Sequence, residues 1–436
     1  MPLPHTRVTL ANGLDVLVHE DHDCPIVAVN VWYHVGSKNE KPGRTGFAHL
    51  FEHLMFEGSE HHDKGYFHPL QEAGGTLNGS TNADRTNYWE VVPTNALELA
   101  LWMESDRMGY LLPALTDQKF QNQRDVVLNE RRQNYENRPY GFAGMAMMKA
   151  LYPPDHPYHW LTIGEAADLR ATELADVRAF FQTYYRPRNA SLALAGDIDT
   201  DRAIALVEDY FGGIDAGDPP PPVEAAAPVP PETEVRLVLE DRVELPRLYL
   251  AWHSAGLFAD GDAEMDLIAE ILAGSKTSRL YRALVYDQRI ATEIAASQNS
   301  REIGGFFQIV ATAAPGRSLE ELEAAIAREL AGFIAAGPTA TEMERCMAQS
   351  ESHFIYRLQT VGGFGGKSDQ LNAYNVFLGD PDYFDQDLDR YRQASPANLQ
   401  DAAARALQAA HRITLSVVPR GRLDLALEGS TSVSVA

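Results

Sequence analysis

The sequence predicts an α+β fold in which two homologous domains each pack helices on a mostly antiparallel sheet. Three observations support this class. Strand-like runs occur in pairs and are followed by helical stretches, the same order of elements occurs in both halves of the chain, and a proline-rich segment separates the halves. Strands followed by long helical stretches are typical of helices packed on an antiparallel sheet.

The two halves begin with the same kinds of element. Residues 14–35 contain the β-rich runs LDVLVHE and IVAVNVWYHVG, and a helical stretch follows over 45–56. In the second half, VRLVLED and LYLAWHSAG precede a helical stretch over 263–273. The run YWEVVP at 88–93 matches FFQIVATAAP at 306–315 in order and position. Sequence similarity between the halves is weak, so the duplication rests on the order of the elements.

A segment rich in proline and glycine lies near the middle of the chain. Over 212–233 it reads GGIDAGDPPPPVEAAAPVPPET. Four consecutive prolines cannot lie inside a helix or a central strand, and they favour an extended, semi-rigid spacer. We therefore expect a first domain over 1–211, a linker over 212–233 and a second domain over 234–436. A long surface loop within one domain is the alternative.

The composition excludes several classes of protein. The chain has 436 residues, with 37 Lys and Arg against 61 Asp and Glu, which gives a formal net charge of −24. Nucleic acid is not an expected partner, because phosphate binding needs a basic face. No apolar run approaches the roughly 18 residues of a membrane span, and no secretory signal opens the sequence. Two cysteines, Cys24 and Cys346, suit a reducing compartment, so we expect a cytoplasmic protein without a membrane partner.

A metal-binding pattern occurs in the first half. Residues 46–58 read GFAHLFEHLMFEG, which places His49 and His53 four residues apart, on one face of a helix. Glu52 lies on the same side. Two neutral imidazoles at this spacing can share a zinc ion while the carboxylate reaches a water molecule. A surface helix with two histidines is the alternative, but the surrounding residues are almost all apolar, and a buried helix must pair or ligate its polar groups.

A third ligand is needed, and Glu130 is the candidate. The segment 117–138 is strongly helical, and Glu130 follows Val126 by four residues and Val127 by three. This spacing predicts that its carboxylate lies on the apolar stripe, where it needs a partner or a metal ion. A salt bridge with Arg131 or another arginine explains the position equally well.

The pattern HLFEH at 49–53 together with Glu130 resembles the pitrilysin/insulinase family of zinc peptidases. Further segments match the landmarks of that family in order, and the match is stronger before the linker than after it. The resemblance implies one Zn²⁺ per chain held by His49, His53 and Glu130, with Glu52 as general base. The other matching segments are GSKNEKPGRTGFAHLFEHLMFEGS (36–59), GGTLNGSTNADRTNYWEVVP (74–93), VVLNERR (126–132), HPYHWLTIG (156–164) and YYRPRNASLALAGDID (184–199).

Two further pairs of residues draw their expected roles from the resemblance. Many family members have a glutamate seven residues before the ligand glutamate that helps to orient the site. Here that position is Gln123, and Asp125 is the nearest carboxylate, off register. The stretch 74–92 is expected to form a hairpin whose first strand adds an extended peptide as an extra strand. Asn78 would lie near the scissile bond.

The substrate strand is expected to include Gly79 and Thr81 as well as Asn78. Gly79 stands where the family usually has alanine, so the stiffness of this strand is expected to differ. A simple exposed turn is the alternative to a substrate strand.

The second half of the chain is expected to be non-catalytic. The stretch equivalent to HLFEH reads DLIAE at 266–270 and has no histidine. In the family, two such double units face each other and close a chamber, so this chain would form half of a clamshell and would dimerise.

The expected dimer is a heterodimer. The family also uses an Arg and a Tyr seven residues apart, near the strand at 305–314, and that strand contains neither. Arg279 and Tyr286 have the spacing but lie in a helical segment. We therefore expect a partner subunit that is homologous, lacks zinc and supplies this pair, with a homodimer as the alternative.

The expected function is that of a zinc metalloendopeptidase that hydrolyses unfolded peptides or oligopeptides. The alternatives are a non-catalytic scaffold and a peptide-binding subunit. One other motif, VGGFGGKS at 361–368, resembles a phosphate loop, but the first glycine of that pattern is replaced by Val361. We expect a flexible glycine turn there.

Overall fold

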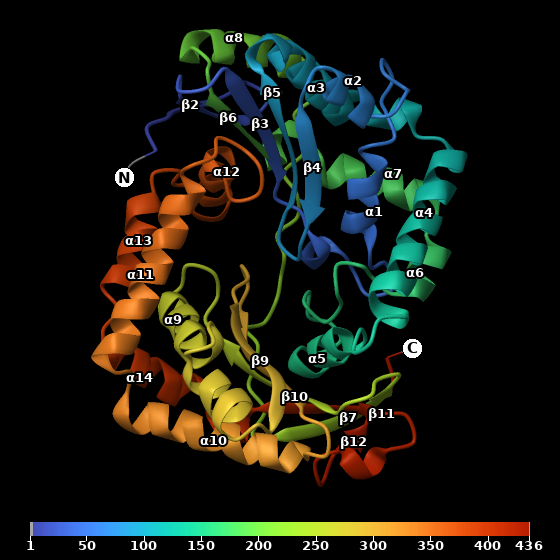
Figure 1. The fold of residues 1–436 in the computed structure, drawn as a ribbon. Helices are drawn as coiled ribbons and strands as arrows, with labels where there is room; N and C mark the ends of the chain where they lie inside the picture. Colours follow the sequence, from blue (N-terminus) through green and yellow to red (C-terminus); the bar gives the residue numbers. More distant parts are fainter. Residues whose placement is uncertain (1–2, 436) are drawn as a thin grey trace. The chain divides into compact units, whose positions relative to one another are not determined.

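The computed structural model describes residues 3–435, which cluster into two compact units. Unit 1 contains the chain up to residue 131 together with 160–224 and 353–386. Unit 2 contains 132–159, 225–352 and the residues from 387 onward. Each unit has one six-stranded sheet covered by helices (Figure 1). The predicted α+β class is confirmed.

The sheet of unit 1 is mixed. Its strand order is β1-β2-β6-β3-β5-β4, and only the β2–β6 pair is parallel. Strand β4 is therefore an edge strand with one unpaired side. The strands are β1 (Thr6–Thr9), β2 (Asp15–Glu20), β3 (Ile26–Tyr33), β4 (Thr76–Thr81), β5 (Thr86–Pro93) and β6 (Ala190–Gly196).

The helices that belong wholly to unit 1 cover both faces of its sheet. They are α1 (Phe47–Leu54), α2 (Phe67–Glu72), α3 (Leu97–Ala114), α4 (Asp117–Arg131), α6 (Ala166–Ala171), α7 (Leu174–Tyr184), α8 (Thr200–Phe211) and α12 (Lys367–Leu378). Successive side chains of a strand point to opposite faces. Tyr88 of β5 faces Arg107 of α3, and its neighbour Asn87 faces Asp369 of α12. Strand β6 is buried along its whole length because it is covered on both sides.

Helix α12 comes from the second half of the chain and lies beside the strands of the first half (Figure 1). Asp369 anchors it. Its Oδ1 accepts hydrogen bonds from Trp32 Nε1 at 2.8 Å, Asn87 Nδ2 at 3.1 Å and Asn30 Nδ2 at 3.2 Å, and its Oδ2 accepts one from Gly365 N at 2.7 Å. One buried carboxylate thus ties two strands to the segment that precedes α12.

The glycine segment 361–366 packs directly on this sheet. A Cβ atom at Gly362 would lie 2.6 Å from Ala28 Cβ and 2.6 Å from Val91 Cγ2, so only glycine allows this close approach. Gly362 thus brings this turn against the strands, whereas Gly363 has open space around it. The flexibility of the turn stays a prediction.

The sheet of unit 2 is also mixed. Its order is β12-β7-β11-β8-β10-β9, with parallel pairing of β7 to β11 and to β12. The strands are β7 (Val235–Asp241), β8 (Arg247–Ser254), β9 (Ala291–Asn299), β10 (Gly305–Ala313), β11 (Ile413–Pro419) and β12 (Thr431–Ser432). The helices are α5 (Ala143–Leu151), α9 (Asp262–Ala273), α10 (Leu319–Ala336) and α14 (Pro396–Ala406), while α11 (Ala340–Arg357) and α13 (Phe384–Arg392) contain residues of both units.

The two units exchange helices between the halves of the sequence. Unit 1 takes α12 from the second half, and unit 2 takes α5 from the first half, where α5 packs on β8 and β11. The stretches 1–211 and 234–436 each supply one complete sheet. Between Phe211 and Val235 there is no α-helix or β-strand, as the proline-rich sequence predicts.

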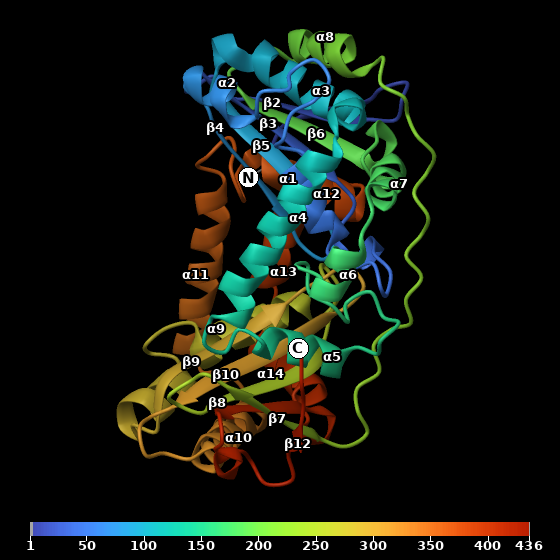
Figure 2. The same cartoon turned by 90° about the vertical axis from the view of Figure 1, so that its right-hand side faces the viewer.

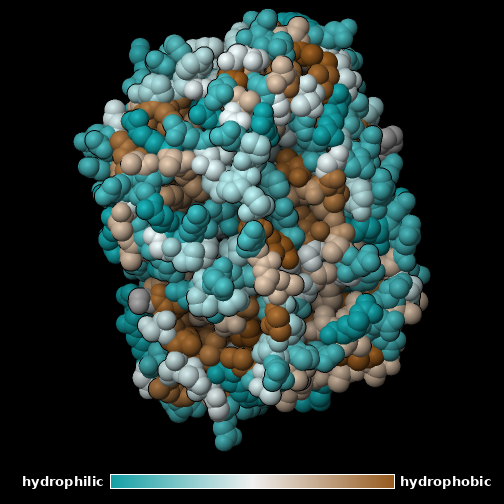
Figure 3. Space-filling view, turned by 180° about the vertical axis from the view of Figure 1, so that it is seen from behind, coloured by the Kyte–Doolittle hydropathy of each residue, from teal (hydrophilic) through white to brown (hydrophobic). Residues whose placement is uncertain are grey.

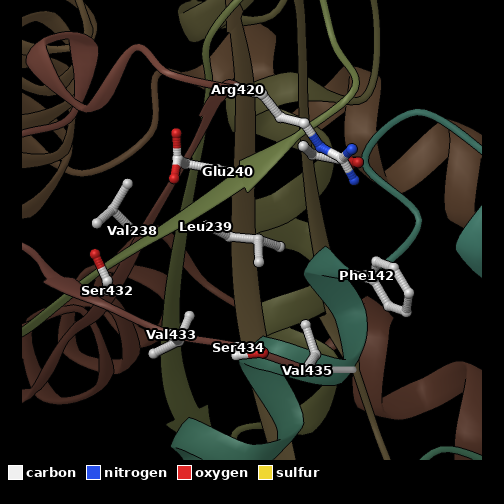
Figure 4. Close-up of a pocket in the computed structure, with 10 residues that line it drawn as sticks. Phe142, Val238, Leu239, Glu240, Arg420, Ser432, Val433, Ser434 and Val435 are labelled. Atoms are coloured by element: carbon white, nitrogen blue, oxygen red, sulfur yellow. The ribbon is translucent and has the colours of Figure 1, made fainter.

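The C-terminal residues close a small cavity in unit 2. The cavity has a volume of about 180 Å³ and lies beside β7 (Figure 4). Leu239, Phe142 and Val435 contribute to its wall, and Glu240 and Arg420 also line it. The segment after β12 therefore packs as part of this unit.

The molecular surface has both apolar and polar regions. Figure 3 shows several apolar patches separated by polar residues on the face seen from behind. Between residues 3 and 435, no helix is both long and apolar enough to cross a membrane.

Candidate metal centre

Helix α1 presents the HLFEH sequence at the edge of a buried core. Gly46 starts the helix with a φ of 88°, a left-handed conformation that favours glycine. The apolar side chains of the helix are buried, among them Leu50, Phe51 and Leu54. His49 and His53 occupy the remaining face, with side chains 14% and 24% exposed. The spacing predicted from the sequence therefore places both imidazoles together.

Helix α4 lies alongside α1 and brings the third group (Figure 2). The Oε2 atom of Glu130 lies 3.6 Å from His49 Nε2 and 3.4 Å from His53 Nε2. All three candidate ligand atoms lie within 4.8 Å of one another, and no other described group of three or more His, Cys, Asp or Glu residues has this geometry. The three residues named from the sequence are thus neighbours in space.

The arrangement fits a zinc ion. Ligand atoms about 2.0–2.2 Å from a tetrahedral zinc lie roughly 3.3–3.6 Å from each other, close to the two distances from Glu130. Burial, and secondarily the charge of His53, lowers the pKa of His49 to about 4. This imidazole is therefore neutral at pH 7, and neutral imidazole is the form that binds metal.

The surroundings of Glu130 differ from the expectation. Val127 is buried, but Val126 is 43% exposed, so α4 lacks the apolar stripe that was predicted. The side chain of Glu130 is 36% exposed and lies beside the two histidines rather than in a core. Arg131 donates to Gly164 O at 3.1 Å.

Glu52 lies on the side of α1 that faces strand β4. Burial raises the pKa of its carboxyl group, while the Thr81 hydroxyl and the charges of His53 and Arg85 act in the opposite direction. Its location next to the histidines and next to an edge strand allows it to exchange a proton with a molecule held between them.

Glu40 accepts hydrogen bonds from the first N–H groups of α1. This role was not predicted from the sequence. Its Oε2 accepts a hydrogen bond from Gly46 N at 2.8 Å, and its Oε1 accepts one from Ala48 N at 2.9 Å. Burial raises the pKa of this carboxyl group to about 8. An acidic residue shortly before a helix start is a usable signal, because free N–H groups and the helix dipole favour a carboxylate there.

Strand β4 runs beside the site and contains the expected substrate residues. Asn78 is exposed, and its Oδ1 accepts a hydrogen bond from Gly79 N at 2.8 Å. A Cβ atom at Gly79 would lie 3.0 Å from Tyr88 Cδ1 and 3.1 Å from Phe56 Cζ. Glycine therefore lets the strand approach the residue that follows α1. The roles of Asn78, Gly79 and Thr81 in substrate binding stay predictions.

The two residues expected to orient the site lie on α4 together with Glu130, and their role in orienting it stays a prediction. Gln123 Nε2 donates to Glu57 Oε1 and so ties α4 to the segment that follows α1. Asp125 is exposed. The Gln123–Glu57 hydrogen bond holds α4 against the segment that leads out of α1.

Arg85 is a second residue that sequence reasoning missed. Its Nη1 donates to Ser80 O at 2.9 Å and to Ser80 Oγ at 2.6 Å, and its guanidinium lies 5.0 Å from the centre of the Trp32 ring. These contacts hold the end of the β4–β5 hairpin in place beside Glu52. No sequence motif distinguishes such an arginine, which lies in a tight turn between two strands.

The Arg and Tyr with the family spacing lie in unit 2, where the Arg is paired and the Tyr is exposed. Arg279 Nε bonds to Glu342 Oε1 at 2.6 Å, and its Nη2 donates to Gly337 O at 2.9 Å. Tyr286 is 74% exposed, on a short π-helical turn over Tyr281–Asp287. On α9, Asp266 stands where the first half has a histidine, and it accepts a hydrogen bond from Tyr391 Oη at 2.7 Å.

The fold and the site together define a class, the α+β proteins that carry an inverted H-x-x-E-H helix and a distant glutamate. The chain belongs to the insulinase family, peptidase family M16. The model of that family, "Insulinase (Peptidase family M16)", matches residues 15–153, and "Peptidase M16 inactive domain" matches residues 172–350.

Relatives with similar sequences are named as zinc proteases. The chain is 28% identical to zinc protease PqqE of Helicobacter pylori, over 88% of this chain and 87% of that protein. It is 25% identical to the uncharacterized zinc protease YmxG of Bacillus subtilis, over 81% and 85%. It is also 25% identical to a probable mitochondrial-processing peptidase subunit beta of Arabidopsis thaliana, over 62% and 51%.

Solved structures share the fold. The chain superposes on a protease from Helicobacter pylori with a TM-score of 0.89 and 24% identity, covering 96% of this chain and 100% of that one. It superposes on a peptidase M16 inactive domain from Pseudomonas fluorescens with a TM-score of 0.84 and 18% identity, covering 99% and 100%. These likenesses extend over both sheets.

Proposed function

We propose that the protein is a zinc-dependent peptidase that cleaves extended, unfolded peptides. The observation that carries this proposal is the convergence of His49, His53 and Glu130 next to the half-buried carboxyl group of Glu52. The zinc proteases among its relatives support the choice of metal.

Each residue of the site has a defined task. His49, His53 and Glu130 would hold one zinc ion per chain, and the ion would polarise the scissile carbonyl group and acidify water. Glu52 would take the proton of the attacking water and deliver it to the leaving amine. Its raised pKa suits this task, because a base works best when its pKa lies near the working pH.

The substrate would bind along β4. This strand has an unpaired edge and lies beside α1. An extended peptide added to such an edge is held by main-chain hydrogen bonds, which tolerate varied side chains. Asn78, Gly79 and Thr81 would contact it near the scissile bond.

A partner subunit would complete the enzyme. The proposal is a heterodimer with a zinc-free homologue that supplies an Arg and Tyr pair and encloses the peptide in a chamber, with a homodimer as the alternative. It is supported by the engagement of Arg279 with Glu342 and the outward position of Tyr286. Light scattering and peptide hydrolysis, measured for the chain alone and after adding such a homologue, distinguish these assemblies.

The test of the function is metal content together with peptide hydrolysis. We expect about one zinc per chain by elemental analysis, hydrolysis of unstructured peptides, loss of hydrolysis with a chelator, and recovery when zinc is added. A chain that stays free of zinc after zinc is supplied would overturn the proposal. A chain that binds zinc but cleaves no peptide, alone or with the homologue, would leave peptide binding without hydrolysis as its function.

A further inference from the structure

A hollow of about 640 Å³ lies in unit 1, between the sheet and the segment 358–363. Strands β3, β4 and β5 contribute Ile26, Thr76, Trp89 and Val91 to its wall. None of these side chains belongs to the metal centre, so the hollow is a separate feature of the same unit.

The register of the sheet shows how this hollow relates to strand β4. Thr76 pairs with Val91, and Asn78 pairs with Trp89. Directly paired residues of antiparallel strands point to the same face. Thr76 and Asn78 therefore share the face of the hollow, and both are exposed there.

Strand β4 faces the metal centre with its other side. Gly79 pairs with Tyr88, and its hydrogens point toward Phe56, which follows α1. The zinc helix and the hollow thus lie on opposite faces of the same edge strand. A peptide added to β4 continues the alternation, so every second side chain of that peptide lies on the face of the hollow.

The hollow has apolar walls on two sides and a polar rim that includes Asp23 and Gln359. Ile26, Val91 and the Trp89 ring form the sheet side, and Val361 lies in the segment opposite them. The carboxylate of Asp21, which also lines the hollow, is paired with Lys367 Nζ, so its charge is compensated. Such a site stabilises a large apolar group through its buried area.

The segment that covers the hollow is held in place. Lys367 N donates to Thr360 O at 2.9 Å, Ser368 N donates to Val361 O at 3.0 Å, and Asp369 accepts from Gly365 N. Gly362 rests on the sheet without room for a side chain. The hollow therefore exists before a ligand arrives, which lowers the entropy cost of binding.

We propose that this hollow is the side-chain subsite that gives the enzyme its preference, and that it takes a large apolar side chain of a peptide held on β4. The inference rests on the proposed function. It also assigns a role to the segment 358–363, which covers the subsite.

The test uses a peptide series in which each position in turn is Ala, Phe or Lys. At one position on the hollow's face, we expect kcat/KM for Phe to exceed that for Ala by roughly tenfold or more, as expected when a pocket selects an apolar group. The variant Thr76→Phe fills the hollow from β4, and Gln359→Trp fills it from the covering segment. Each is expected to reduce the preference to less than about threefold.

Thr6→Phe is the matched control, because Thr6 is an exposed residue of β1, at the opposite edge of the same sheet. It is expected to keep the preference of the wild type. Circular dichroism confirms that each variant is folded, and the second filling variant keeps the test valid if the first does not fold. Equal rates for Phe and Ala at every position, a preference for Lys, or an unchanged preference in a folded filling variant would overturn the inference.

A binding measurement separates this inference from the proposed function. Fluorescent peptides of the same series are titrated into Glu52→Gln, alone and combined with Thr76→Phe. Tighter binding of the Phe peptide that is lost in the double variant supports the subsite even if the wild type hydrolyses nothing. Absence of any peptide binding, both to the chain alone and after the zinc-free homologue is added, overturns both the subsite and the peptidase.

Discussion

His53 Nε2 and Glu130 Oε2 lie 3.4 Å apart, although the two residues belong to different helices. Helix α1 supplies the two imidazoles, and α4 supplies the carboxylate. The Gln123–Glu57 hydrogen bond joins α4 to the segment that follows α1. The metal centre therefore depends on how α1 and α4 pack, as well as on the HLFEH motif.

Replacing Glu130 by Gln removes the only anionic ligand of the proposed centre. We expect zinc content to fall well below one per chain, because an amide is a much poorer ligand than a carboxylate. Elemental analysis after dialysis measures this. The matched control is Glu72→Gln, at a position of α2 that is 70% exposed. This variant protein should retain its zinc. Full zinc occupancy in Glu130→Gln would contradict the ligand assignment.

Replacing Glu52 by Gln separates metal binding from proton transfer. We expect the variant to keep its zinc and its melting temperature, while kcat falls by roughly 10²–10⁴-fold, the usual contribution of a general base. Peptide hydrolysis and elemental analysis on the same sample give the answer. Activity within threefold of the wild type would show that another group accepts the proton.

Replacing Glu40 by Ala leaves the buried N–H groups of Gly46 and Ala48 without their acceptor. We expect a loss of about 2 kcal/mol in the free energy of unfolding and roughly tenfold weaker zinc binding, because the helix that carries both histidines is less well held. Glu40→Gln keeps one acceptor oxygen and should lie between the two. Denaturant titration and zinc competition with a chelator are the measurements. Unchanged zinc affinity in a destabilised variant would limit Glu40 to a structural role.

The half-buried His253 and the buried His156 of unit 2 predict a loss of stability in acid. Burial, and secondarily the charge of His156, lowers the pKa of His253 on β8 to about 4. Tyr152 is the aromatic neighbour of both rings. Unfolded His253 takes up a proton near pH 6.5, before the folded form does, so the free energy of unfolding falls as the pH drops from about 6.5 to 4.

The variant His253→Phe removes this titration. We expect the decrease between pH 6.5 and 4 to shrink by roughly 1–3 kcal/mol. Urea unfolding at several pH values measures it. His68→Phe, at a 74% exposed position, should show the slope of the wild type. Identical slopes for His253→Phe and the wild type would refute the assignment.

Replacing Asp369 by Ala removes the acceptor of Trp32, Asn87, Asn30 and the backbone of Gly365. We expect a loss of about 3 kcal/mol or more, because buried donors are left unpaired, and faster hydrogen exchange over 361–378. Asp382→Ala is the control, since that carboxylate is 73% exposed. Wild-type exchange over 361–378 would show that other contacts hold α12.

Local patterns in the sequence gave reliable predictions where spacing along one helix decides the result. His49 and His53 share a face because they are four residues apart. Glu130 could not be placed by the same reasoning, because its predicted apolar stripe is absent at Val126. Its position beside the histidines depends on the packing of two helices, and the family resemblance was needed to find it.

Long-range contacts were beyond the reach of these patterns. Glu40 accepts hydrogen bonds from backbone N–H groups, so its only local signal is its place shortly before the start of a helix. Asp369 lies far along the chain from Trp32 and Asn87, and nothing near it predicts that its helix covers the first sheet. The close packing of Gly362 likewise depends on Ala28 and Val91, which are distant from it in the sequence.

The exchange of α5 and α12 sets an order of events during synthesis. The strands of the first sheet are complete at Gly196, but α12, which covers one face of that sheet, ends at Leu378. At about 5–20 residues per second, a ribosome needs roughly 10–40 seconds to synthesise the chain from Gly196 to Leu378. Meanwhile the face with Asn30 and Trp32 stays uncovered on the nascent chain. A first half made alone, from a gene split at the proline-rich segment, would leave that face bare until the second half supplied α12.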